Sequence, residues 1–157
     1  MIKIGTAWTC KSFTVSAISH YLKNSLKRTA PTAKAAFIIN GDTIHSLFNI
    51  PVSNRKNYLE NLTGDSLSKL QDQFQSIKFI IIDEFSMIGQ EMLCKIDKRL
   101  KQAKNKQLPF GGVSIILTGD PAQLLPVLAL PLYDKSGRTE FGIAGLDSYL
   151  KFVTVLN

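Results

Sequence analysis

FIIIDEFS at residues 79–86 is the stretch that decides the fold. Its first four residues are all apolar, and two acids, Asp83 and Glu84, follow directly. An apolar run without alternation is typical of a strand covered on both faces of a parallel sheet. Ligands of such sheets bind at the carboxyl ends of the strands, so we expect the two acids to lie in a ligand site. A strand that ends in two solvated acids at a turn is the alternative.

Outward from this stretch, helix-like and strand-like patterns alternate along the chain. Apolar runs rich in isoleucine or valine indicate strands, and apolar residues spaced three or four apart indicate helices. This order predicts an α/β fold with a parallel sheet and right-handed crossovers. The expected strands are Met1–Ile4, Lys78–Ile82, Val113–Thr118 and Phe152–Leu156, the expected helices are Lys11–Leu26, Ser66–Ser76 and Gln90–Lys106, and the remainder includes a turn with an apolar run at Thr29–Ile39 and a polar loop at Asn49–Gly64.

The composition is that of a globular chain. The 157 residues are 45% hydrophobic, which suits one domain with a core and argues against a disordered chain. No apolar run reaches the length of a membrane span and no secretory signal is readable, so we expect no membrane partner. Cys10 and Cys94 form no metal-ligand spacing, and a reduced, intracellular setting is expected. The net charge of +7 suits a polyanionic partner, or a basic soluble domain without one.

The second motif, GTAWTCKS at Gly5–Ser12, has the skeleton of a phosphate-binding loop. A short strand precedes it and a helix follows, so backbone N–H groups would surround phosphate oxygens at a helix N-terminus. Lys11 is placed to reach the outer phosphates, and the hydroxyl of Ser12 is placed to hold magnesium. Because Cys10 replaces the second glycine that such loops require, the match is weak when it is taken alone.

The third motif, LTGDPAQLLPV at Leu117–Val127, is again an apolar strand that ends in polar residues, with Gln123 among them. A glutamine here can sense a terminal phosphate by hydrogen-bonding to it or to the attacking water. The acids of the first motif suit the same chemistry, because one carboxylate can hold magnesium and the other can act as general base. Three such strand ends in one small sheet indicate a nucleoside triphosphate site.

The fourth motif, APTAKAAFIINGDTIHSLF at Ala30–Phe48, is rich in short hydrogen-bonding side chains and includes a lysine. Such side chains suit the phosphates and sugars of a nucleic acid strand. His45 taken alone is more typical of an ordinary half-buried histidine than of a ligand. The residues with this character are Thr32, Lys34, Asn40, Thr43 and His45.

Together these blocks resemble the PIF-type (petite integration frequency) DNA helicases, including those carried by Helitron transposons. The chain looks like the first RecA-like domain of that family, and the similarity covers nearly its whole length. The matching residues are Gly5, Thr6, Ala7, Thr9, Lys11 and Ser12 in the phosphate loop, Ile81–Glu84 with Ser86 and Met87 in the acidic motif, Ala30–Thr32, Ala35, Ala36, Asn40, Gly41 and Thr43–Ser46 in the fourth motif, Leu108–Gly112, and Gly119, Asp120, Gln123, Leu124, Pro126 and Val127 in the glutamine motif.

The resemblance implies a RecA-like phosphate-loop domain of a motor that uses ATP and Mg²⁺. Such a motor moves along single-stranded DNA from five-prime to three-prime and unwinds forked or duplex DNA in repair, recombination and telomere maintenance. Members serve the nucleus and the mitochondrion, and we expect the nucleus first for this chain.

The resemblance also implies a role for each matching residue. Lys11 would bind phosphates, Ser12 and Asp83 would hold magnesium, Glu84 would activate water, and Gln123 would sense the terminal phosphate. The loop that would bind the nucleotide comprises Gly5, Thr6, Ala7, Thr9, Cys10, Lys11 and Ser12, and the residues that would lie toward the DNA are Thr43, His45, Phe110, Gly111 and Gly112.

The phosphate loop departs from the family pattern at two positions. Members have glycine where this chain has Trp8 and Cys10. Glycine allows a positive φ and a close approach of backbone to phosphate, and a side chain forced into that conformation costs about 1–3 kcal/mol. Milder departures are Ala33 in place of glycine, and Pro121 and Leu125 beside Gln123.

The resemblance predicts that residues 1–157 form a single, partial motor domain. The segment that contacts adenine, the arginine motif and the second motor domain of the family lie outside the chain. Because translocation needs closure between two domains, we expect the isolated chain to lack unwinding activity.

Other interpretations stay open. The chain could be an inactive remnant that binds nucleotide or DNA weakly. A small phosphate-loop kinase is disfavoured by the fourth motif and by Gln123. Cys10 at a helix N-terminus could have a lowered thiol pKa and a redox role, but no resolving cysteine is near in sequence. Six cations between Lys95 and Lys106 are most simply the solvated face of a packed helix, and could raise nonspecific DNA affinity.

Overall fold

A computed structural model describes residues 2–4, 11–52, 59–120, 124–136 and 139–152. Within these residues a five-stranded sheet forms the centre of the molecule, in the order β1-β5-β4-β2-β3, and every strand pair is parallel. The predicted α/β fold with a parallel sheet is therefore confirmed. The strands are β1 Ile2–Ile4, β2 Leu26–Ala30, β3 Asp42–Thr43, β4 Phe79–Ile82 and β5 Ser114–Gly119.

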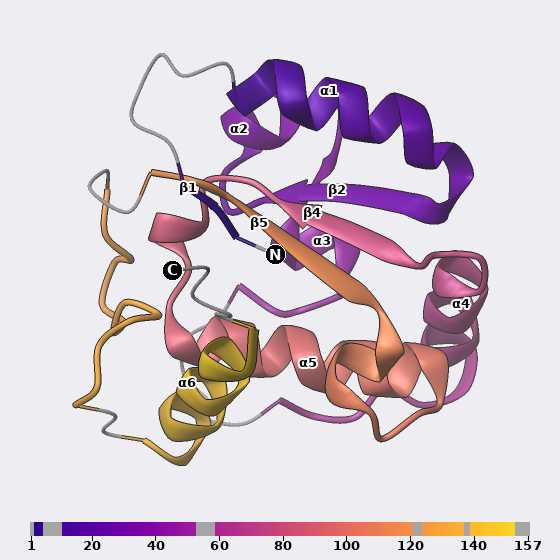
Figure 1. The fold of residues 1–157 in the computed structure, drawn as a ribbon. Helices are drawn as coiled ribbons and strands as arrows, with labels where there is room; N and C mark the ends of the chain where they lie inside the picture. The colour runs from indigo at the N-terminus through magenta and orange to yellow at the C-terminus, as the bar shows by residue number, and fades with distance from the viewer. Residues whose placement is uncertain (1, 5–10, 53–58, 121–123, 137–138, 153–157) are drawn as a thin grey trace.

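Helices cover both faces of this sheet (Figure 1). Helices α1 and α2 lie on one face, while α3, α4 and α5 lie on the other, and α6 packs against the outer side of α5. The α-helices are α1 Lys11–Leu22, α2 Ala33–Ile38, α3 Ile44–Leu47, α4 Gly64–Phe74, α5 Gln90–Lys104 and α6 Glu140–Phe152, and the 3₁₀ turns are η1 Lys23–Ser25, η2 Phe85–Met87 and η3 Pro109–Gly112.

Strand β4 shows why its sequence contains no alternation. Ile80 and Ile82 join the larger hydrophobic cluster on the α5 side, whereas Ile81 joins the cluster beneath α1 and α2. All three side chains are fully buried. A strand in the middle of a parallel sheet needs apolar residues on both faces, which confirms the interpretation of the FIII run.

The first helix and the following strand differ from the sequence-based expectation. We predicted a helix over Lys11–Leu26, but α1 ends at Leu22, and Leu26 begins β2. Lys23 has a left-handed backbone (φ 43°), which ends the helical path. Strand β2 reads LKRTA and carries two cations, so its sequence gives little indication of a strand between β4 and β3. Its position is stabilised by parallel pairing on both sides.

The C-terminal part of the chain also differs. We expected a strand over Phe152–Leu156, but Phe152 is the last residue of α6, and residues 153–157 lie outside the described part. Helix α6 contains Gly142 and Gly145, and glycine lowers helix propensity. A Cβ at Gly145 would collide with the carbonyl oxygen of Gln90, so these glycines allow α6 to pack closely on α5.

Among the described residues, no helix combines the length and apolar character that crossing a membrane requires.

Candidate functional site

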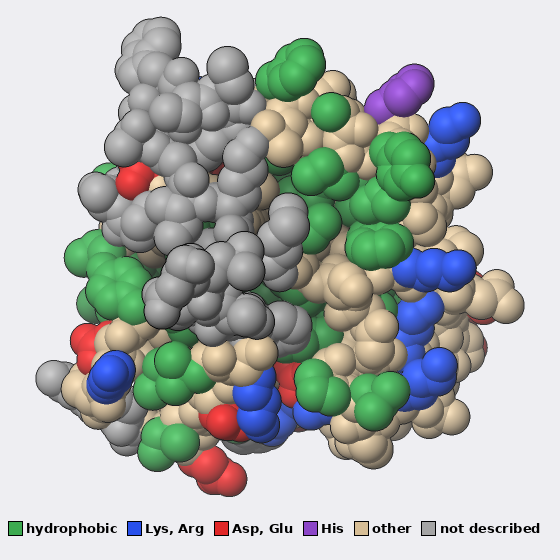
Figure 2. Space-filling view, viewed as in Figure 1, with side chains coloured by type: hydrophobic (Ala, Val, Ile, Leu, Met, Phe, Trp, Pro, Cys, Tyr) green, Lys and Arg blue, Asp and Glu red, His purple; other side chains and the backbone are tan. Residues whose placement is uncertain are grey.

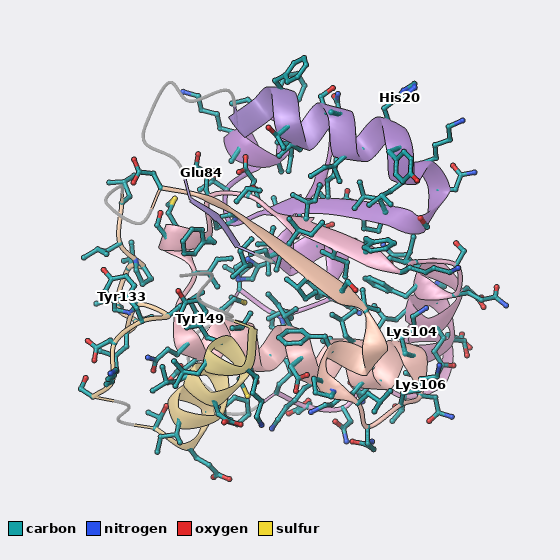
Figure 3. All side chains as sticks on the ribbon, viewed as in Figure 1. His20, Glu84, Lys104, Lys106, Tyr133 and Tyr149 are labelled. Carbon is teal, nitrogen blue, oxygen red and sulfur yellow. The ribbon has the colours of Figure 1, made fainter. Side chains whose placement is uncertain are left out.

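The carboxyl ends of the parallel strands meet at one edge of the sheet, as expected. Residues Ile4 and Gly119 pair at the ends of β1 and β5, and Ile82 ends β4 beside them. Figure 3 shows Glu84 at this edge, far from Lys104 at the other end of the strands. Strand β1 ends at Ile4 and α1 begins at Lys11, so the GTAWTCKS segment connects this edge to the start of α1.

Several predicted site residues cannot be placed in detail. Residues 5–10 and 121–123 lie outside the described part of the chain, so the predictions for Gly5–Cys10 and for Gln123 stay predictions. Lys11 and Ser12 form the start of α1, as the phosphate-loop interpretation requires, but their side chains are not described.

Asp83 is held at the end of β4 by both neighbouring strands. Its backbone N–H donates to the carbonyl oxygen of Thr29 on β2 at 2.9 Å. Its Oδ1 accepts a hydrogen bond from Oγ1 of Thr118 on β5 at 2.6 Å. In each strand these residues lie two positions after the isoleucine that packs beneath α1, so both side chains lie on the α1 face of the sheet. Asp83 therefore lies on the same side as the helix that follows the predicted phosphate loop.

Glu84 follows in a left-handed conformation, with φ 53° and ψ 45°. This backbone region is uncommon for residues other than glycine and tends to occur at functional sites. The turn it starts packs against the end of β5, because a Cβ at Gly119 would approach Cδ1 and the backbone nitrogen of Phe85 to 3.0 Å. Glycine at position 119 thus lets the acidic turn and the strand that leads to the glutamine motif lie in direct contact.

The threonines of the fourth motif have local structural roles. Oγ1 of Thr32 accepts a hydrogen bond from the N–H of Ala35 and caps α2. Oγ1 of Thr43 accepts a hydrogen bond from the N–H of Ser46 and caps α3. Capping hydroxyls of this kind typically stabilise a helix by about 1 kcal/mol. The caps fix the position of this motif at the carboxyl ends of β2 and β3.

A groove of about 520 Å³ opens beside these caps. Thr32 and His45 line one side, Lys95 of α5 contributes a cation, and Met87 and Val127 contribute apolar surface. Burial, and secondarily the charge of Lys95, lower the pKa of His45, so the imidazole is neutral at pH 7. The groove therefore combines the cation of Lys95, the acid Glu91, hydrogen-bonding groups and apolar walls. The sequence did not assign Lys95 to a site, because it is one of many cations on its helix.

Gln90 fixes the segment that forms the far wall of this groove. It is almost fully buried, its backbone N–H donates to the carbonyl oxygen of Leu130, and its Nε2 donates to that of Pro131 at 3.0 Å. Gly89 and Pro131 form an antiparallel bridge at the same place. The chain that leaves the glutamine motif is thus attached to the start of α5.

The LPFGG turn lies elsewhere, and the predicted DNA-facing positions of Phe110 and Gly111 are corrected. Turn η3 precedes β5 and is at the opposite end of the sheet from Asp83. The Phe110 ring is 0% exposed in the main core, and its N–H donates to Oδ1 of Asp97 at 2.6 Å. A Cβ at Gly111 would collide with the carbonyl oxygen of Leu100. Phe110 and Gly111 thus pack the turn before β5 against α5. Among Phe110, Gly111 and Gly112, only Gly112 is exposed.

Most of the cations on α5 also make internal contacts. Lys101 pairs with Asp97 at 2.6 Å, the ammonium of Lys98 lies 3.9 Å from the centre of the Phe141 ring, and Lys104 donates to the carbonyl oxygen of Phe74 at 2.8 Å. Burial is the main cause of a lowered Lys104 pKa. These lysines are therefore not a purely solvated face.

The donor set fits a magnesium ion held with few protein ligands. Within the described residues, no three histidine, cysteine, aspartate or glutamate side chains gather as a metal group. Magnesium is usually bound through one or two carboxylates, several waters and the substrate's phosphates, so such a cluster is not required. Asp83 supplies a carboxylate that is oriented by a hydrogen bond, which suits this mode of binding.

Comparison with known families identifies the chain. A family model described as PIF1-like helicase matches residues 1–149. The chain belongs to the PIF1-like helicase family. The resemblance drawn from the four motifs is thereby confirmed, as is the RecA-like α/β fold class.

Two relatives illustrate the similarity within the PIF1-like family. The chain is 36% identical over 135 residues to the ATP-dependent DNA helicase RRM3 of Saccharomyces cerevisiae. This alignment covers 78% of this chain and 18% of that protein. It resembles a crystal structure of the Pif1 helicase from Bacteroides in complex with ADP-AlF3 and ssDNA at 32% identity and a TM-score of 0.69, over 80% of this chain and 29% of that one.

A third relative has a structure described as DNA unwinding at forked dsDNA by two coordinating Pif1 helicases. It aligns at 32% identity with a TM-score of 0.70, over 81% of this chain and 30% of that one. The chain spans about a fifth of the length of the curated PIF1-like relatives that it matches.

Proposed function

We propose that this chain forms the nucleotide-binding part of an ATP-dependent DNA helicase that uses magnesium. The observation that carries the proposal is the position of Asp83, whose side chain is held on the α1 face of the sheet, at the edge where α1 begins. A carboxylate next to the start of the first helix is what a phosphate-loop motor needs to hold the metal of its nucleotide.

Each predicted residue then has a role within this site. Lys11 binds the outer phosphates, and Ser12 and Asp83 hold the ion. Magnesium, when bound, neutralises charge on the phosphates. Glu84 accepts a proton from the attacking water, and Gln123 hydrogen-bonds at the terminal phosphate. The contact between the acidic turn and Gly119 supports this division of roles, because it keeps Glu84 beside the strand that leads to Gln123.

Single-stranded or forked DNA is the proposed partner. The groove beside Thr32, His45 and Lys95 lies next to the acidic turn, since Met87 and Ile88 line it as well. Solved relatives are described with ssDNA and with forked dsDNA. By family resemblance, the proposal includes five-prime to three-prime movement together with a second motor domain, roles in repair, recombination and telomere maintenance, and a nuclear or mitochondrial location.

The first experiment is calorimetric titration of the folded chain with magnesium–ATP, with and without single-stranded DNA. We expect binding that requires magnesium and is reduced in Asp83→Asn. Thr43→Ala, which removes a helix cap outside the metal site, is the matched control and keeps this dependence. Equal affinity with magnesium and with a chelator would contradict the proposed role of Asp83.

An inactive remnant is the second candidate, and the phosphate-loop sequence favours it. Trp8 and Cys10 place side chains where the family has glycine. We expect the double substitution Trp8→Gly and Cys10→Gly to raise the affinity for magnesium–ATP, because glycine permits close approach of the backbone to phosphate. The same titration measures this change. Unchanged affinity in a folded double variant would reject the steric explanation.

A further inference from the structure

The hydrogen bond between Thr118 and Asp83 joins two strands at the proposed metal site. Thr118 is only 1% exposed, and its Oγ1 lies 2.6 Å from Oδ1 of Asp83. Hydrogen bonds from a hydroxyl to a carboxylate are short and stronger than those between neutral groups. The bond thus fixes the orientation of the Asp83 carboxylate. Thr118 bonds to Oδ1, so Oδ2 is the oxygen that it leaves for a metal.

Position 118 has the properties of an orienting residue. It lies within β5, one residue before Gly119, and is surrounded by strands on both sides. A β-branched side chain is stiff about χ1, so the hydroxyl direction is defined by the strand rather than by a flexible side chain. A residue near a metal ligand that hydrogen-bonds to it typically controls the ligand's orientation and its affinity for metal.

We propose that Thr118 is a positioning residue that aims the carboxylate of Asp83 at the magnesium ion. This inference rests on the proposed function, because it assumes that Asp83 holds the metal. Since Thr118 also precedes the glutamine motif, the same bond links the metal-binding strand β4 to the strand that leads to Gln123.

The chain offers a matched control at Thr29. This threonine is fully buried near the end of β2, and its Oγ1 has no hydrogen-bond partner within the described residues. It contacts Asp83 through its backbone carbonyl, which a substitution of the side chain leaves in place. Thr29→Val and Thr118→Val are therefore the same change in adjacent regions of the sheet, and only Thr118→Val removes a hydrogen bond to Asp83.

The test is a titration of the full chain with Mn²⁺ in the presence of ADP, followed by electron paramagnetic resonance. We expect Thr118→Val to weaken Mn²⁺ affinity by about 10- to 100-fold, as loss of a partner of a metal ligand typically does. Thr29→Val should retain the wild-type affinity, and Thr118→Ser, which keeps the hydroxyl on a less restricted side chain, should lose much less affinity than Thr118→Val. Metal-free ADP binding should be equal in all variants, which separates aiming of the ligand from general damage to the site.

The outcomes distinguish this inference from the proposed function. If Asp83→Asn leaves Mn²⁺ affinity unchanged, or if the wild-type chain binds no Mn²⁺ with ADP, the proposed function is wrong, and the role of Thr118 is wrong with it. If Asp83→Asn abolishes Mn²⁺ binding but Thr118→Val matches the wild type, only the Thr118 inference is overturned. Should Thr118→Val fail to fold, Thr118→Cys provides the test, because a thiol is a weak donor, and wild-type affinity in that variant would overturn the inference.

Discussion

At the scale of single residues, two glycines share a left-handed backbone but differ in the space around them. Gly111 and Gly64 have nearly the same φ, 61° and 55°. A Cβ at Gly111 would collide with the carbonyl oxygen of Leu100, whereas a Cβ at Gly64 would meet no atom within 4 Å. Substitution of Gly64 therefore measures the cost of backbone strain alone, whereas substitution of Gly111 adds the cost of a steric clash.

We expect Gly64→Ala to lower the free energy of unfolding by about 1–2 kcal/mol, which is the cost of a left-handed alanine. Gly111→Ala should cost about 1–3 kcal/mol more, because it must also displace α5 from the turn before β5. Urea denaturation of both variants measures the difference. Equal losses would show that the turn adjusts without disturbing the helix, and would contradict a steric requirement for glycine at position 111.

At the scale of elements, α5 organises the molecule through a buried cation. Arg99 is 2% exposed, and its Nη1 donates to the carbonyl oxygen of Glu60 at 2.8 Å and to Oε1 of Gln102 at 2.7 Å. Its Nη2 donates to the carbonyl oxygen of Asn49 at 3.4 Å. Burial lowers the Arg99 pKa from its ordinary value. The guanidinium thus ties both ends of the segment between α3 and α4 to α5.

We expect Arg99→Met to lower the free energy of unfolding by about 1–3 kcal/mol, because the hydrogen bonds from the buried guanidinium to the carbonyl oxygens of Asn49 and Glu60 are lost. Lys98→Met on the same helix removes an exposed cation–π contact and should cost only about 0.5–1 kcal/mol. Denaturant unfolding measures both losses, and limited proteolysis should show faster cleavage between residues 49 and 60 in Arg99→Met alone. Similar stabilities of the two variants would argue against the anchoring role.

His45 in helix α3 should make the free energy of unfolding depend on pH. The pKa of His45 is lower in the folded chain than its ordinary value of 6.5, mainly through burial and then through Lys95. The unfolded chain therefore binds the proton more readily, and stability falls as the pH decreases below about 6.5. We expect His45→Gln to reduce this loss between about pH 7 and pH 5, as measured by urea denaturation. An unchanged pH dependence in His45→Gln would contradict the prediction.

At the scale of the whole molecule, positive charge is distributed unevenly. Lys and Arg side chains gather on the right-hand side of Figure 2, the end of the molecule where Lys104 and Lys106 are labelled in Figure 3. The groove at the other end contains Lys95. The net charge of +7 therefore does not by itself mark the proposed DNA surface.

Lys95 and Lys106 allow a direct test of whether the groove or the net charge binds DNA. Lys95 lies in the groove, whereas Lys106 lies just after the other end of α5. We expect Lys95→Gln to weaken binding of a labelled single-stranded oligonucleotide and to reduce the salt slope of log K by about 0.7, the value for one phosphate contact. Lys106→Gln, at the opposite end of the sheet, should change both much less. Fluorescence anisotropy over a series of salt concentrations measures these effects. Equal effects would indicate binding by net charge alone.

Much of the fold could be predicted because its signals are local. The FIII run, the amphipathic pattern of α5 and the position of polar residues at strand ends depend on neighbours in sequence. Strand β2 and helix α6 could not be predicted in this way, since one is polar and the other contains glycines. The pairing of β2 with its neighbours and the packing of α6 on α5 depend on residues far away in the chain.

The sequence by itself determined the α/β class, the central strands β4 and β5 with the polar residues at their ends, and the family. Only the tertiary structure decided which of those residues meet. Thr118 and Asp83 are 35 residues apart, yet the register of β5 against β4 makes them neighbours. Packing of the turn before β5 on α5 places Phe110 in the core, and the position of α5 brings Lys95 to the groove. Pairings between distant segments depend on the free energy of the whole fold, which no local pattern contains.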